Sequence, residues 1–213
     1  MIIKFNRKVY FISLALLIII YIVGLIGLNT SIRDDVAALT PITLMISGLI
    51  LFINHREWSR YFVIFVIFIS LAGYLVELIG VESKILFGVY TYGETLGYKI
   101  YGVPVVMGLN WFLMVYSCGM VANMFRFGTF VKSVIGALLM VILDLSLETV
   151  AVKLDFWTWE NDIVPIQNYV VWFIVAFIFL IFFHNLDLKK LNRIAVALFI
   201  IQYIFFFILS YTL

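Results

Sequence analysis

The sequence predicts an all-α integral membrane protein, a single bundle of about seven transmembrane helices. Hydrophobic residues make up 65% of the 213 residues and charged residues only 12%, whereas about 25% of an ordinary soluble domain is charged. The apolar residues also gather in stretches that can cross about 30 Å of hydrocarbon. Every candidate site therefore lies in or beside a bilayer.

Seven apolar stretches predict the helices, which we expect to form one domain over residues 1–213. In chain order they run from Val9 to Leu28, Leu39 to Ile53, Tyr61 to Gly80, Val103 to Met124, Val131 to Val152, Ile166 to His184 and Asn192 to Thr212. The first is too long for a typical signal-peptide core and no A-x-A-like cleavage site follows it, so we expect it in the mature protein. We assign the helices before Ile53 and after Asn192 mainly to packing.

The placement of Lys and Arg predicts the orientation. With seven crossings, one side holds ten of the 14 basic residues, and these are Lys4, Arg7, Lys8, Arg56, Arg60, Arg126, Lys132, Lys189, Lys190 and Arg193. By the positive-inside rule the N-terminus is inside and the C-terminus outside. The two longest loops, Val81 to Gly102 and Lys153 to Pro165, then lie on the outer side.

Three carboxylates inside apolar segments are the candidate catalytic groups: Glu77, Asp144 and Glu148. A charge within a membrane helix costs at least a few kcal/mol, so such a residue is a functional candidate. Asp144 and Glu148 are four residues apart and share a helix face. Two carboxylates this close in a low dielectric do not both ionise, so one can serve as a general acid. Alternatively the acids are structural, and Glu77 reaches interfacial water near its helix end.

Polar and aromatic residues near these acids complete the candidate site. Asn110 lies beside Trp111, and Asn168 lies near the start of the sixth helix, where each could line the pocket or bond to the helix backbone or a neighbouring helix. Four of the five Trp residues fall in the predicted outer half: Trp111, Trp157, Trp159 and Trp172. An interfacial aromatic belt is the alternative explanation for them.

Several other kinds of site lack their usual signals. Cys118 is the only cysteine, and His55 and His184 fall at the inner edge, where we expect them to be interfacial, so we predict no metal site. No P-loop, G-x-G-x-x-G, serine nucleophile elbow or H-E-x-x-H motif occurs. We also expect no nucleic-acid partner.

Residues 74–172 carry a family resemblance. The motifs are Glu77-Leu-Ile-Gly80, Phe87-Gly-Val-Tyr90-Thr-Tyr92-Gly93, Gly102-Val-Pro104, Asn110-Trp111, Asp144-Leu-Ser-Leu-Glu148, Asp155-Phe-Trp157-Thr-Trp159, and Pro165-Ile-Gln-Asn168-Tyr169 with Trp172. They resemble the carotenoid biosynthesis membrane proteins that include the gamma-carotene and bisanhydrobacterioruberin hydratases. The resemblance implies a multi-pass protein of a bacterial or archaeal cytoplasmic membrane.

The resemblance also implies a lyase that adds water to the terminal double bond of an acyclic carotenoid and needs no cofactor. A carboxylic acid would protonate the alkene, and water would capture the tertiary cation. We expect Asp144 to donate the proton, Glu148 to hold its proton or the water, and Glu77 and Asn110 to position the water. Aromatic residues would surround the cation, among them Tyr90, Tyr92 and Trp157. The expected partners are the lipid bilayer and a hydrophobic carotenoid, with contacts to other pathway enzymes left open.

Three other functions remain compatible with the residues. A lycopene-type cyclase would begin with the same protonation but capture the cation with a second alkene in a dry pocket. A small proton- or cation-coupled transporter would use the acids as a pathway, although the sequence has no internal repeat of the kind that many transporters contain. In a noncatalytic scaffold, the acids would only satisfy one another's hydrogen-bonding needs.

Overall fold

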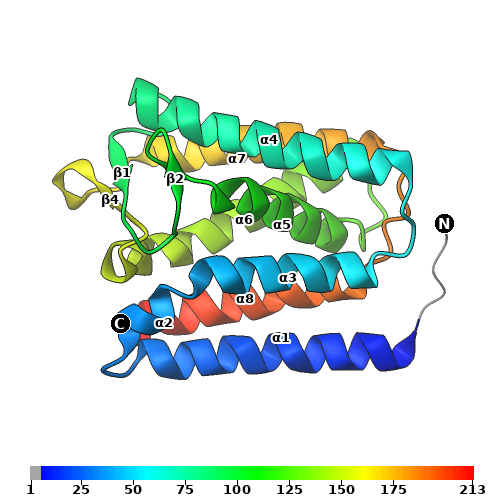
Figure 1. Ribbon diagram of the computed structural model, residues 1–213. Coiled ribbons are helices and arrows are strands. Elements are labelled where there is room, and N and C mark those ends of the chain that lie inside the picture. Colours follow the sequence, from blue (N-terminus) through cyan, green and yellow to red (C-terminus); the bar gives the residue numbers. More distant parts are fainter. Residues whose placement is uncertain (1–5) are drawn as a thin grey trace.

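A computed structural model describes residues 6–213 and confirms the all-α class (Figure 1). The helices are α1 (Arg7–Leu28), α2 (Arg33–Ala37), α3 (Thr40–Asn54), α4 (Arg60–Ser83), α5 (Val106–Ala122), α6 (Thr129–Ala151), α7 (Ile166–Asn185) and α8 (Arg193–Thr212). Among these residues, six helical spans are long and apolar enough to cross a membrane, with α2 and α3 counted as one. The protein is therefore a multi-pass membrane protein.

Side chains at the helix starts fix several of these boundaries. Asn6, Ser59 and Asn192 each cap a helix, because their side-chain oxygens accept from backbone N–H groups of the first turn. Pro41 lies in the first turn of α3, where a missing N–H costs nothing. These caps begin each helix within about two residues of the predicted apolar stretch.

Helix α5 is the centre of the bundle (Figure 1). Thirteen of its 17 residues are buried, and it packs against α3, α4, α6, α7 and α8. A helix that is apolar on all sides is expected to lie inside a bundle. The outer helices instead expose large aliphatic side chains, as Ile12, Ile64 and Ile178 do, which suits contact with lipid.

Helix α5 is shorter than the predicted span from Val103 to Met124. Val103 and Pro104 form strand β3, which pairs with β2 (Lys99–Ile100) in a small hairpin. Proline lacks the backbone N–H and disfavours helix in the residue before it, so the helix begins after Pro104. The hairpin and the end of α4 frame one end of the bundle.

The two long loops join through a second pair of strands, which the sequence did not predict. Strand β1 (Tyr90–Tyr92) pairs antiparallel with β4 (Trp157–Trp159), with Tyr90 opposite Trp159 and Tyr92 opposite Trp157. In both strands the outer two side chains are buried and the middle threonine is exposed. We call this β1–β4 pair the lid, because it covers the buried carboxylates.

The start of α1 and the end of α8 lie at opposite ends of the bundle, while the number of membrane crossings and their orientation stay predictions (Figure 1). The C-terminal end of α8 lies next to α2, at the same end of the bundle as the lid (Figure 1). The connections α3–α4, α5–α6 and α7–α8, which carry Arg56, Arg126, Lys189 and Lys190, lie at the end opposite the lid. Lys4, also counted in the charge pattern, lies outside the described residues. The assignment of the lid to the outer face stays a prediction.

Candidate functional site

Glu77 on α4 is held by three aromatic donors. Its Oε2 accepts from the hydroxyls of Tyr90 (2.8 Å) and Tyr92 (2.7 Å), and its Oε1 accepts from Trp111 Nε1 (2.8 Å). Glu77 is only 2% exposed, because α4 continues to Ser83 and the lid covers this part of the helix. The alternative in which Glu77 reaches interfacial water is therefore wrong.

A glycine one turn earlier allows this arrangement. A Cβ on Gly73 would lie 2.4 Å from the Trp111 Cβ and 2.5 Å from its Cγ, so only glycine lets the indole lie this close to α4. Gly73 and Glu77 are four residues apart and share a face of the helix. Trp111 also stacks on Trp172 at 4.4 Å between ring centroids, which joins α5 to α7 beneath the lid.

Glu148 on α6 is held in the same way by the other strand of the lid. Its Oε2 accepts from Trp157 Nε1 (3.0 Å) and Trp159 Nε1 (2.9 Å). Asn168 on α7 donates from Nδ2 to Glu148 Oε1 at 3.4 Å and to Asp144 Oδ2 at 3.3 Å. The predicted pair on one helix face is thus bridged by the predicted asparagine.

The hydrogen bonds are shared unequally among the three acids. Within residues 6–213, Glu77 and Glu148 each accept three, whereas Asp144 accepts the single long bond from Asn168. These partners are Tyr, Trp and Asn side chains, not cations. Hydrogen-bond donors to a carboxylate favour its charged form. Of the three carboxylates, Asp144 has the fewest donors.

The two lid tyrosines remain hydrogen-bond donors. Burial, followed by the negative charge of Glu77, raises the pKa of both Tyr90 and Tyr92 well above the usual value. Both phenols therefore keep their protons at any physiological pH. Each can donate to Glu77 but cannot act as a base.

A small polar cavity lies between the three acids. It has a volume of about 20 Å³ and is lined by Glu77, Asp144, Glu148, Asn168, Met107, Phe87, Tyr90, Tyr92, Trp157, Trp159 and Trp172. About one probe sphere of volume, with two to four polar partners, is enough to hold a water molecule. The cavity therefore has room for one water within reach of the carboxylates.

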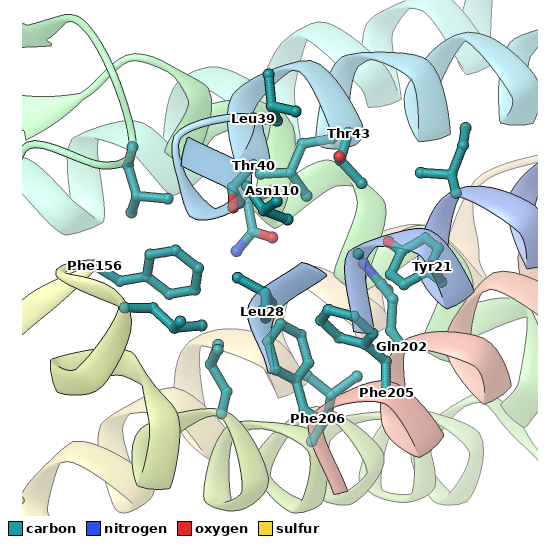
Figure 2. A pocket seen from close by; sticks show the side chains of 18 of the residues that line it. Tyr21, Leu28, Leu39, Thr40, Thr43, Asn110, Phe156, Gln202, Phe205 and Phe206 are labelled. Atoms are coloured by element: carbon teal, nitrogen blue, oxygen red, sulfur yellow. The ribbon is translucent and has the colours of Figure 1, made fainter. Parts of the chain in front are cut away.

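A larger and mostly apolar pocket of about 310 Å³ adjoins this cavity. It extends from Phe156, Leu154 and Trp157 beneath the lid, past Asn110, to Tyr21 and Gln202 (Figure 2). Asp144, Met107, Trp157 and Trp172 line both spaces. Asp144 is thus the one acid of the three that borders the apolar pocket as well as the polar cavity.

The structure brings most of the predicted site residues together. Asn110 is the exception, because it lines the large pocket and not the small cavity where we expected it to position water beside Glu77. Trp111 lies behind Glu77 and lines neither space. Within residues 6–213, no group of three or more His, Cys, Asp and Glu side chains is arranged to hold a metal ion.

Helices α1, α3 and α8 contribute more than packing. They supply much of the wall of the large pocket, through residues such as Tyr21, Thr43 and Gln202. Phe156, Phe87 and Met107 are further lining residues that the sequence analysis missed. For Thr43 and Gln202 the sequence gives no signal, because a single polar residue in an apolar helix can equally line a pocket or contact another helix. Phe156 could have been found, because it lies between Asp155 and Trp157 in one of the motifs.

His55 is buried, contrary to the expected interfacial position. It is 1% exposed, stacks on Phe62, and donates from Nε2 to the Glu57 carbonyl at 2.8 Å. Its Nδ1 therefore accepts from the Tyr116 hydroxyl, at 2.6 Å. Burial lowers the pKa of His55 to about 4. This network lies at the end of the bundle opposite the lid and is structural.

Together, fold and site define a class: a multi-pass membrane protein with buried carboxylates between a water-sized polar cavity and an apolar pocket. A family model described as carotenoid biosynthesis protein matches residues 36–213, and the chain belongs to that family. Comparison with curated proteins and with solved structures gives no match. Helix α1 lies before the matched residues, although it forms part of the pocket wall.

Proposed function

We propose that this protein is a cofactor-free carotenoid hydratase, a lyase that adds water to the terminal double bond of an acyclic carotenoid. The position of Asp144 carries the proposal, because its carboxyl group borders both an apolar pocket and a cavity with room for one water. Hydration of an alkene needs an acid in contact with the double bond and a water close enough to capture the cation. The family membership supports a carotenoid as the hydrocarbon.

In the first step, protonated Asp144 transfers its proton to the less substituted carbon of the terminal alkene. The π electrons form the new C–H bond, Asp144 becomes a carboxylate, and the neighbouring carbon becomes a tertiary cation. Asp144 suits this role because it accepts only one long hydrogen bond. A carboxylic acid kept neutral by an apolar site can act as a general acid at neutral pH.

In the second step, the water captures the cation. Its oxygen forms the C–O bond, and the proton it releases goes to the Asp144 carboxylate or to Glu148, so the net reaction adds one H₂O. Trp157 and Trp172 line both spaces, and their rings can stabilise the cation by cation–π attraction. Glu77 and Glu148, held by the lid, orient the water.

The decisive experiment is pigment mass spectrometry in a strain that makes linear carotenoids. The wild type should convert them to products heavier by one water, and Asp144→Asn should lower that conversion about 100-fold or more. Asp35→Asn, a change to an exposed aspartate on α2, is the matched control and should keep the product. Full hydration by Asp144→Asn at normal protein levels would refute the assigned donor.

The same measurement separates hydration from cyclisation. A cyclase would capture the cation with a second alkene and give a product of unchanged mass with a shorter chromophore. The polar cavity beside Asp144 favours water as the nucleophile. An isobaric product from the wild type would therefore contradict the role we give to that cavity.

A further inference from the structure

The large pocket is bordered by exposed side chains on one flank of α1. Three of its lining side chains are more than half exposed: Ile19 (57%) and Val23 (61%) on α1, and Leu39 (51%) at the start of α3. Ile19 and Val23 are four residues apart and share a face of the helix. Exposed side chains within a membrane-spanning helix meet hydrocarbon and not water. The pocket therefore reaches the lipid-facing surface where α1 lies beside α3.

Contacts on either side of these residues close the rest of the seam between α1 and the α2–α3 segment. Towards the lid, Gly27 packs so closely on α2 that an added Cβ would lie 2.7 Å from Val36 Cγ2. Towards the opposite end, Asn54 Nδ2 on α3 donates to Ser13 Oγ on α1 at 2.8 Å. Helix α1 lies at the edge of the bundle, so the stretch between these two contacts faces the bilayer (Figure 1).

The pocket is too small to enclose a linear carotenoid. Its volume of about 310 Å³ lies at the lower end of the range that holds drug-sized ligands, about 300–1,000 Å³. An acyclic carotenoid is much longer than such a ligand, so only its end group fits. Asp144 lines the same pocket as Ile19 and Val23. With the end group beside Asp144, the remaining polyene must leave the pocket through its exposed side.

We propose that the seam bordered by Ile19, Val23 and Leu39 is a lateral portal, through which a linear isoprenoid enters from the bilayer. The polyene beyond the end group stays in the portal and in the lipid during the reaction. Entry from the lipid keeps this hydrocarbon out of water, which strongly disfavours apolar surface. The inference rests on the proposed function, because it takes the large pocket as the site of the carotenoid end group. It adds that α1, which lies before the matched residues 36–213, forms one edge of the entry route.

Tryptophan substitutions test the portal through the hydration reaction. Val23→Trp and Leu39→Trp place a larger side chain at either edge, and each should lower the yield of hydrated carotenoid several-fold at matched protein levels. Ile22→Trp is the control, because Ile22 is 50% exposed on the same helix but does not line the pocket. It should keep the wild-type yield. Wild-type yields from both portal variants, or an equal loss in Ile22→Trp, would overturn the portal.

A second readout does not depend on the reaction. A nitroxide label on Val23→Cys, in phosphatidylcholine vesicles, should become less mobile in its EPR spectrum when lycopene is included. A label on Ile22→Cys should not respond. The native Cys118 is buried and does not compete for the label. The response at Val23→Cys should persist when Asp144→Asn is added, because the acid is not part of the portal.

The two readouts distinguish failure of the portal from failure of the proposed function. A response to lycopene at Val23→Cys without any hydrated product would refute the hydratase and leave the portal in place. Hydration that survives both tryptophan variants, with a label that ignores lycopene, would refute the portal alone. Equal responses of the Val23→Cys and Ile22→Cys labels would mean that lycopene only changes the surrounding lipid, and would also refute the portal.

Discussion

Gly73→Ala should destabilise the protein through a residue that never touches substrate. The added Cβ would lie 2.4 Å from Trp111 Cβ and 2.8 Å from Cδ1, and Trp111 is fully buried, so the indole must shift. Overpacking of this kind costs about 1–3 kcal/mol. The gain in helix propensity offsets about 0.5–1 kcal/mol, while a weakened bond from Trp111 to Glu77 costs about 1–2 kcal/mol more.

The net loss is about 2–3 kcal/mol, which corresponds to a fall in Tm of roughly 5–10 °C for a chain of this size. The assay is thermal unfolding of the purified protein in detergent. Gly24→Ala is the matched control, because Gly24 also lies within a helix but its added Cβ would approach no atom closer than 3.5 Å. If both variants melted with the wild type, Trp111 would not be tightly packed against α4, and our explanation for the position of Glu77 would fail.

Three further predictions concern the lid and the opposite end of the bundle. Trp157→Phe and Trp159→Phe each remove one donor to Glu148 Oε2. Each should lower stability by about 1–3 kcal/mol. The double variant should lose more than the sum of the two single losses, since Glu148 Oε2 then lacks both indole donors. Strictly additive losses in thermal unfolding would contradict this. The double variant Thr91→Cys, Thr158→Cys should form a disulfide on mild oxidation. The two positions are opposite each other in the lid, and such pairs lie about 5.5 Å apart between Cα atoms. If thiol titration still found both new cysteines free, the strand pairing would be excluded. The folded-state pKa of His55 is about 4 and lies below the unfolded value of about 6.5, so stability is complete above pH 6.5 and falls as the pH drops towards 4. Between pH 7 and pH 5 the loss should be about 2 kcal/mol, and melting curves of His55→Gln should show a correspondingly weaker decline over this range.

The helices could be predicted from sequence because the bilayer sets their length and polarity. The predicted and observed boundaries agree within a few residues, except where Pro104 delays α5. The acids were found for the same reason, since a carboxylate is conspicuous in an apolar helix. The helices and the acids could thus be found from the order of apolar and charged residues, without any knowledge of tertiary contacts.

The lid and the pocket wall could not be predicted in this way. Strands of three residues are too short for a periodic signal, and β1 pairs with a segment about 65 residues away in the sequence. Tyr90 and Tyr92 entered the candidate site through family resemblance alone. Gln202 had no such support, because a single amide in an apolar helix usually bonds to a neighbouring helix.

The alternation of side chains in the lid also makes assembly of the site a test of correct folding. Tyr90 and Tyr92 converge on one oxygen of Glu77, and Trp157 and Trp159 converge on one oxygen of Glu148. A slip of one residue would turn a strand's aromatics outward and its threonine inward, leaving one acid without both of its lid donors. The acids thus favour the correct register of the strands that cover them, and a chain with a misfolded lid would also lack an ordered candidate site.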